Sequence, residues 1–147
     1  MGAGALNQIK ITALSRIVVT GGDVMHAMKA GDPGYNGFGE AYFSWVEYGA
    51  VKAWKQHLRM TLNLVVPFGE IRFVFFTPIP ERSFRCEIIG ASHYVRITVP
   101  PGIWFGFQGL AKPNSLLLNL ADTPHDPAEC LRRETNDIPV NWNEKLP

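Results

Sequence analysis

The feature that most constrains the fold of this chain is a stretch of alternating polar and apolar residues near its centre. Between residues 55 and 63 the even positions are apolar, with the exception of Gln56. The odd positions are all polar: Lys55, His57, Arg59, Thr61 and Asn63. A period of two predicts a β-strand, because successive side chains of a strand point to opposite faces of the sheet. The polar face either meets solvent on one side of a sheet or lines a cavity in a barrel, where its cations and imidazole would act on an anionic ligand.

The rest of the chain also predicts short strands. Runs rich in β-branched or aromatic residues, bounded by turn residues, occur at 9–11, 16–19, 40–47, 70–76, 84–89, 94–99, 103–107 and 115–120. We expect the runs at 84–89 and 94–99 to form a hairpin, and the run at 115–120 to be buried on both faces. Helix is expected only as short turns, at residues 24–31 and 128–132. This pattern is typical of an all-β sandwich or barrel.

Composition narrows the class of protein. The 147 residues suit a single domain, with a core at about 37–121 and a C-terminal tail at 122–147 that docks through Trp142. The net charge is only +1, and the sequence does not have the clustered cations of a nucleic-acid-binding protein. No apolar run is long enough to span a membrane, and the first residues do not resemble a signal peptide. We therefore expect a soluble cytoplasmic protein with no nucleic-acid or membrane partner.

The two cysteines, Cys86 and Cys130, do not have the spacing of metal ligands. We interpret them as free thiols in a reducing compartment, with a single disulfide between them as the alternative.

Two segments resemble the signature motifs of the cupin superfamily. In the first, Gly49 is followed after five residues by Lys55-Gln56-His57, and later by Asn63. The second is PPGIWFGF, at residues 100–107. Of the positions that metal-binding cupins fill with His or Glu ligands, only His57 keeps such a residue. The resemblance therefore implies a single-domain cupin jelly roll with no metal site, since one imidazole does not hold a catalytic metal.

Within the cupins, residues 37–142 most resemble the dTDP-4-dehydrorhamnose 3,5-epimerase family. FGEAYFSWVEYGAVKAW resembles the strand that leads to the family's catalytic His, and LLLNLADTPHDPAE with IPVNW resembles the end of its fold. The resemblance implies a cofactor-independent epimerase that forms a homodimer. Its substrate would be a nucleotide-linked 4-keto-6-deoxy sugar, or a related keto-sugar, in polysaccharide or glycan biosynthesis.

Two alternatives stay open. One is a 3,4-ketoisomerase on the same class of substrate, because His57 matches the second His of the His-x-His pair in those enzymes. The other is a cupin that binds a sugar or nucleotide without turnover.

The resemblance also implies roles for individual residues. Alignment from Gly49 places Lys55 at the position of the family's general-base His and Leu118 near that of its general-acid Tyr. We expect His57 to remove the proton beside the ketone, with Lys55 as the rival base. The carboxylate partner of the His is expected to be Glu134 or Asp137.

The remaining candidates are expected to bind substrate. Lys52, Arg59 and Arg72 suit the diphosphate, Asn63 is a neutral donor to the enolate, and Trp104 or Tyr42 would stack on the base or sugar. The missing Tyr favours epimerisation at one carbon over epimerisation at two.

Overall fold

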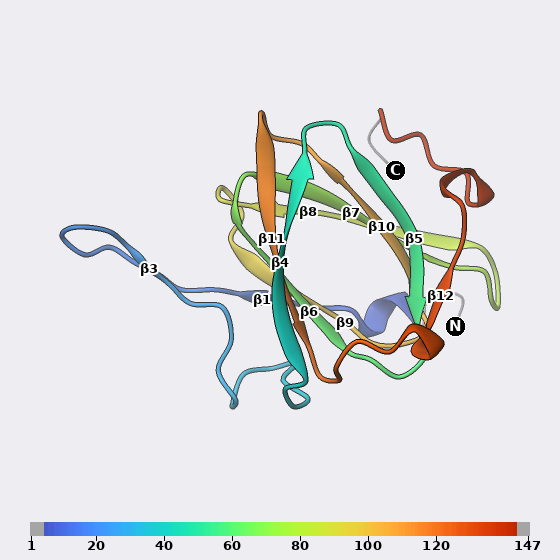
Figure 1. Ribbon diagram of the computed structural model, residues 1–147, viewed down its shortest axis with the longest axis horizontal. Coiled ribbons are helices and arrows are strands. Elements are labelled where there is room, and N and C mark those ends of the chain that lie inside the picture. Colours follow the sequence, from blue (N-terminus) through green and yellow to red (C-terminus); the bar gives the residue numbers. More distant parts are fainter. Residues whose placement is uncertain (1–4, 144–147) are drawn as a thin grey trace.

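The protein is described by a computed structural model that covers residues 5–143. Almost all regular structure in this range is β-strand (Figure 1). In chain order the elements are η1 (Leu6–Gln8), β1 (Lys10–Ala13), β2 (Arg16–Ile17), β3 (Val24–Met25), β4 (Glu40–Glu47), β5 (Val51–His57), β6 (Leu62–Phe68), β7 (Glu70–Thr77), β8 (Ser83–Gly90), β9 (Val95–Val99), β10 (Trp104–Gly109), β11 (Asn114–Ala121), η2 (Pro127–Glu129), β12 (Cys130–Arg132) and η3 (Thr135–Asp137).

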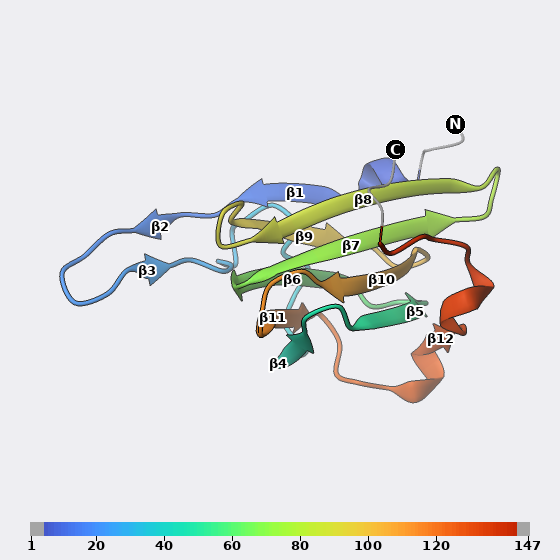
Figure 2. The same cartoon turned by 90° about the horizontal axis from the view of Figure 1, so that it is seen from above.

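Most of these strands form two five-stranded sheets. The strand order is β1-β9-β6-β11-β4 in the first sheet and β12-β5-β10-β7-β8 in the second. The remaining pair, β2 and β3, is a narrow ribbon that projects away from the body (Figure 2). Strands that follow one another in the chain often lie in opposite sheets, as in a jelly roll. The predicted all-β cupin jelly roll with little helix is therefore confirmed.

The core lies between the two sheets and follows from the period of two in each strand. On β7 the buried residues Ile71, Phe73 and Phe75 point into this core. Val74 and Phe76, on the opposite face of β7, join a second apolar cluster that the C-terminal segment covers. The predicted docking of the tail is confirmed, because Trp142 packs against Trp54 with 5.6 Å between the ring centroids.

The alternating stretch at residues 55–63 belongs to two strands rather than one. β5 ends at His57, the chain turns, and β6 begins at Leu62 in the opposite sheet. Two carboxylates from the C-terminal part of the chain hold this turn: Glu129 accepts hydrogen bonds from the N–H groups of residues 58–60, and Asp122 accepts one from Thr61. The prediction of a single strand from 55 to 63 was wrong, because these distant groups satisfy the backbone of the turn.

The predicted hairpin was also wrong. β8 pairs with β7, whereas β9 pairs with β6 and β1 in the other sheet. The two strands meet only at their ends, through a bridge between Gly90 and His93. The run 115–120 was predicted to be buried on both faces, but burial alternates along β11, and one of its faces is only half-buried.

Neither expected helical turn has the predicted bounds. Residues 24–31 contain the strand β3 and no helix. Residues 128–132 contain the end of the short 3-10 turn η2 and then β12, which adds to the edge of β5. Between residues 5 and 143 no helix is long and apolar enough to cross a membrane.

Candidate active site

A cavity of about 710 Å³ lies between the two sheets, beside the edge strands β4 and β12. This volume is in the range of small-molecule binding sites, roughly 300–1,000 Å³. Leu62, Phe105 and Phe107 give the cavity apolar walls, and the first sheet adds Ser44 and Asn119. The cavity therefore offers both apolar contact area and neutral hydrogen-bonding groups to a ligand.

The charged residues around the cavity are mostly cationic. Four cations line it: Lys52, Lys55, Arg132 and Arg133. The two carboxylates in its wall, Glu134 and Asp137, form a reciprocal capping box with the backbone at the two ends of η3. Because the cations outnumber the carboxylates, the wall carries a net positive charge, which favours an anionic ligand.

Lys55 is the cation at the centre of β5. Its cross-strand neighbours are Phe105 on β10 and Arg132 on β12, so two like charges lie directly opposite each other. Such a pair destabilises a sheet. Burial lowers the pKa of Lys55, and the positive charge of Arg132 lowers it further. Among residues 5–143, none forms a hydrogen bond or ion pair with the Lys55 side chain.

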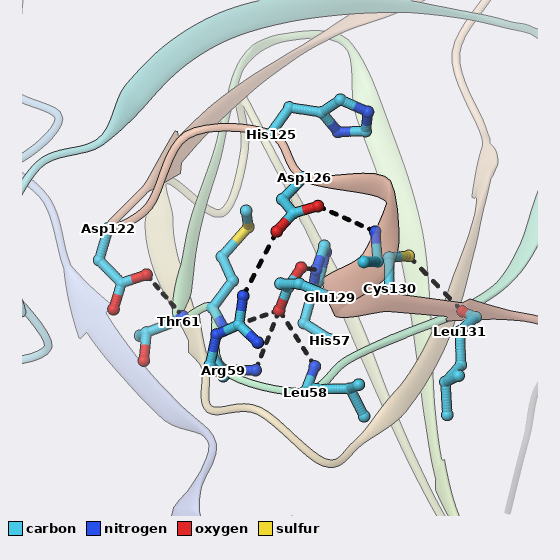
Figure 3. Close-up of polar contacts among 12 residues, drawn as sticks. His57, Leu58, Arg59, Thr61, Asp122, His125, Asp126, Glu129, Cys130 and Leu131 are labelled. Carbon is cyan, nitrogen blue, oxygen red and sulfur yellow. Dashed lines mark hydrogen bonds and ion pairs between the residues drawn. The ribbon is translucent and has the colours of Figure 1, made fainter.

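His57 lies two residues further along the same face of β5 and contacts a carboxylate that the sequence did not reveal. Its Nδ1 is 2.6 Å from Oε1 of Glu129, a fully buried residue (Figure 3). The second oxygen, Oε2, accepts the N–H groups of Leu58, Arg59 and Met60 at 3.1, 2.9 and 2.9 Å. Glu129 is thus fully hydrogen-bonded in its ionised form.

The hydrogen bonds of Glu129 determine its charge and the tautomer of His57. Burial alone would raise the pKa of Glu129, but the N–H groups of Arg59 and Met60 and the hydrogen bond from His57 lower it to about 2. An ionised carboxylate only accepts hydrogen bonds, so Nδ1 of His57 carries a proton. Nε2 is therefore the basic nitrogen of a neutral His57.

The structure corrects the expected partner of the histidine. Glu129 takes this place, whereas Glu134 and Asp137 lie in the cavity wall and cap η3. Glu129 is 72 residues from His57 in the sequence, and no motif links the two. His57 itself is not among the residues that line the cavity. Its ring stacks beside Phe105, which does line it, with 6.2 Å between the ring centroids.

Of the six expected substrate-binding residues, Lys52 and Tyr42 line the cavity and the other four lie elsewhere. Arg59 lies on the turn after β5, exposed, with Nη2 3.5 Å from Asp126. Asn63 is buried in the first sheet, where its amide donates to the carbonyl of Gly34. The turn at 58–61 explains both placements, because it ends the strand that would have carried them beside Lys55.

Arg72 and Trp104 lie on the outer face of the second sheet. Arg72 donates to the carbonyl of Trp142 at 2.7 Å and to Gln108 at 3.2 Å. Trp104 belongs to the cluster under the C-terminal segment, where the Arg133 guanidinium lies 4.8 Å from its ring centroid. Each is one position away from a residue that points inward, Phe73 or Phe105, so strand alternation directs both away from the cavity.

Sequence reasoning missed several residues of the cavity wall. Arg132 and Arg133 were assigned to the tail, although β12 pairs with β5 and brings them to the cavity. Their one signal was the adjacent pair of arginines after a short apolar run. Ser44 and Asn119 come from the first sheet and had no signal that distinguished them from other polar residues.

The fold and the cavity can be compared with known proteins. The chain matches no protein-family model and no curated protein sequence. It is similar to the crystal structure of a dTDP sugar isomerase from Desulfovibrio desulfuricans G20. The two share 30% sequence identity with a TM-score of 0.89, over 95% of this chain and 93% of that one. The chain belongs to this cupin-like family of dTDP-sugar isomerases and epimerases.

Two more distant structures share the fold. A sugar 3,4-ketoisomerase from Thermoanaerobacterium thermosaccharolyticum, solved with TDP, is 15% identical with a TM-score of 0.74, over 87% of this chain and 90% of that one. A dTDP-4-dehydrorhamnose 3,5-epimerase from Bacillus anthracis is 17% identical with a TM-score of 0.78, over 95% of this chain and 87% of that one. Within residues 5–143 no group of three or more His, Cys, Asp or Glu side chains is arranged to hold a metal ion.

Proposed function

We propose that this protein is an isomerase that moves a proton on a carbon next to the keto group of a nucleotide-linked 4-keto-6-deoxy sugar. The observation that carries the proposal is the position of Lys55 and Arg132, two opposed cations without a carboxylate partner inside a cavity of substrate size. Two like charges held this close together in a cavity are suited to an anion. Membership of a family of dTDP-sugar isomerases makes a sugar nucleotide the best candidate for this anion.

Binding follows from the charges and the apolar walls. Lys52 and Arg132 are the cations that we assign to the diphosphate, since phosphate oxygens form strong charge-assisted hydrogen bonds with such groups. Tyr42 and Phe107 supply ring surface for the sugar or the base.

The chemistry is divided between the two candidate residues on the inner face of β5. His57 is the proposed base, because Glu129 fixes its tautomer with Nε2 as the basic nitrogen and its ring stacks beside Phe105 in the cavity wall. Lys55 is the group that activates the ketone, since its amine lies in the cavity itself. The proposed reaction uses no cofactor, which predicts that activity survives dialysis against a chelator.

The test is proton NMR in deuterated buffer with a dTDP-4-keto-6-deoxy sugar. Deuterium at one ring carbon, with inversion there, would support a single-position epimerase and identify the carbon, and deuterium at both neighbouring carbons would indicate a double epimerase. Saturable binding without exchange would contradict the proposal and leave a sugar-binding cupin.

A 3,4-ketoisomerase is the second candidate, and the match to a solved 3,4-ketoisomerase favours it. Its reaction also removes a proton beside the ketone but returns a proton to the former carbonyl carbon. The same NMR experiment distinguishes the two, because the carbonyl carbon signal moves from position 4 to position 3 only in the ketoisomerase.

We also propose that the protein is a homodimer. The outer face of the first sheet exposes Phe43, Trp45 and Phe68, whose side chains are 62, 57 and 55% exposed. An apolar surface of this kind is typical of an interface between proteins. A molar mass of one chain in light scattering at micromolar concentration would contradict the proposal.

The cellular setting is part of the same proposal. Cys86 and Cys130 are both free thiols, which is compatible with the reducing conditions of the cytoplasm. A cytoplasmic isomerase of nucleotide sugars would serve polysaccharide or glycan biosynthesis.

A further inference from the structure

A second pocket lies at the outer face of the second sheet, away from the cavity between the sheets. It has a volume of about 300 Å³ and lies among the turn between β4 and β5, the end of β10 and the C-terminal segment. Arg72 of β7 lines it together with Gln108, Leu110 and Trp142. Among the described residues, none lines both this outer pocket and the cavity.

Arg72 is the cation of the outer pocket. It is only 9% exposed, and between residues 5 and 143 no carboxylate forms an ion pair with it. The described residues that line the outer pocket include no Asp or Glu. A guanidinium stays charged, so its burial without an anion is costly. The outer pocket therefore favours a ligand that brings a negative charge.

The hydrogen bonds of Arg72 leave one edge of its guanidinium without acceptors. Nη1 donates to Oε1 of Gln108 at 3.2 Å and to the carbonyl of Trp142 at 2.7 Å, which fixes the orientation of the group. Nε is buried without an acceptor, and Nη2 donates to no group within residues 5–143. The N–H groups of Nε and Nη2 lie side by side, and this edge binds a carboxylate or phosphate through two parallel hydrogen bonds.

Trp142 adds a further donor. Its indole Nε1 is also buried without an acceptor between residues 5 and 143. Guanidinium and indole groups only donate, so their common partner is a group that only accepts, as an oxyanion does. A water molecule would satisfy a donor but would leave the charge of Arg72 uncompensated. Leu110 and Tyr48 add apolar surface, which suits an organic anion.

We propose that the outer pocket binds a small organic anion through its carboxylate or phosphate group, with Arg72 and the indole N–H of Trp142 as the donors. The volume lies at the lower end of the range for small-molecule sites, roughly 300–1,000 Å³, so the ligand is small. This proposal does not depend on the proposed function, because the outer pocket is separate from the candidate active site.

The experiment is a titration of the ¹⁵N-labelled protein followed by NMR. The probes are benzoate, acetate and inorganic phosphate, with benzamide as the uncharged match of benzoate. We expect benzoate to shift the signals of the Trp142 indole N–H and the Arg72 Nε–H, with half-saturation below about 10 mM, as for a fragment of this size. Tighter binding of acetate than of phosphate would identify a carboxylate ligand, and the reverse order a phosphate ligand.

Two variants test the donors, and a third is the control. Arg72→Lys keeps the charge but loses the two-donor edge, and we expect it to weaken benzoate binding by about tenfold. Trp142→Phe keeps an aromatic ring and the main-chain carbonyl but removes the indole donor, and it is also expected to weaken binding. Arg59→Lys changes an exposed arginine on the turn after β5 and is expected to leave the affinity unchanged.

Four results would overturn the proposal. They are the absence of a saturable shift below about 10 mM, benzamide binding as tight as that of benzoate, unchanged affinity in Arg72→Lys, and shifts confined to residues of the cavity such as Lys55. If Arg72→Lys does not fold, Trp142→Phe decides, and unchanged affinity in that variant would overturn the proposal in the same way.

Discussion

Two cations, one on each sheet, differ in the partners that surround them. In the first sheet Arg96 is fully buried, and it donates to the side chain of Asn63 at 3.1 Å and to the carbonyls of Ala27 and Pro33 at 2.7 and 2.6 Å. Asp32 lies 3.6 Å from the same guanidinium. In the second sheet Lys55 faces Arg132 across the strand pair, with no such partners between residues 5 and 143.

We interpret Arg96 as part of a structural site, and Lys55 as part of the proposed ligand site. The hydrogen bonds of Arg96 satisfy the guanidinium and tie the loop at 27–36 to the sheet, so that its charge contributes to folding. Lys55 and Arg132 are like charges opposite each other, so that an anion bound between them would reduce their repulsion. Cations that lack partners inside a cavity are therefore better indicators of a ligand site than buried cations in general.

The largest effect is expected from breaking the structural group. Arg96→Met leaves the carbonyls of Ala27 and Pro33 and the side chain of Asn63 without their donor. We expect the free energy of unfolding to fall by about 3–5 kcal/mol, the cost of removing one partner from a buried charged network. Urea denaturation measures this change, and a loss below about 1 kcal/mol would show that the network is not structural.

The matched change in the functional group is Lys55→Met. We expect turnover to fall by about 100-fold or more, since the variant loses the group that we propose activates the ketone. The free energy of unfolding is expected to stay the same or rise, because the change removes a repelling charge. Product formation by NMR and urea denaturation test the two parts, with Lys112→Met as the control. If Lys55→Met lowered the free energy of unfolding as much as Arg96→Met does, Lys55 would have a structural role like that of Arg96.

Glu129 holds the turn at 58–60 and also orients His57. The pH dependence of stability tests the first of these roles. Its pKa falls from 4.5 in the unfolded chain to about 2 in the folded protein, so its contribution to stability is present above pH 4.5 and is lost as the pH falls toward 2. We expect Glu129→Gln to lower the free energy of unfolding by about 2 kcal/mol at pH 7, the value of hydrogen bonds to a charged group.

The expected difference between wild type and Glu129→Gln shrinks between pH 4.5 and pH 2, because the carboxylate of the unfolded wild-type chain is then protonated and has to lose its proton on folding. Urea denaturation at neutral and acidic pH measures it. A constant difference across this range would show that the charge of Glu129 is not what stabilises the turn at 58–61.

The smallest effects are expected from changing two arginines, Arg59 on the surface and Arg132 in the cavity. Arg59→Gln breaks an exposed ion pair with Asp126 and is expected to change the free energy of unfolding by less than about 0.5 kcal/mol and KM hardly at all. Arg132→Gln removes a cavity cation, and KM is expected to rise by about tenfold. Steady-state kinetics of both variants measures these KM values. Equal KM values for the two variants would show that Arg132 does not contribute to substrate binding.

The sequence by itself determined the strands and part of the site. Period-two patterns and turn residues predicted the runs that became β4, β7, β10 and β11 to within a few residues, because these signals are local. The same periodicity placed Lys55 and His57 on one face of a strand, and it left open whether that face lines a cavity or meets solvent. Side-chain alternation within a single strand needs no knowledge of the rest of the chain.

The tertiary structure decided everything that depended on which strand pairs with which. It separated β8 from β9, moved Asn63 to the opposite sheet, and turned Arg72 toward the outer face. It also selected Glu129 as the partner of His57 and brought Arg132 opposite Lys55. These contacts join residues about 60–80 positions apart, and they form because the C-terminal segment adds β12 to an open sheet edge and satisfies backbone groups there.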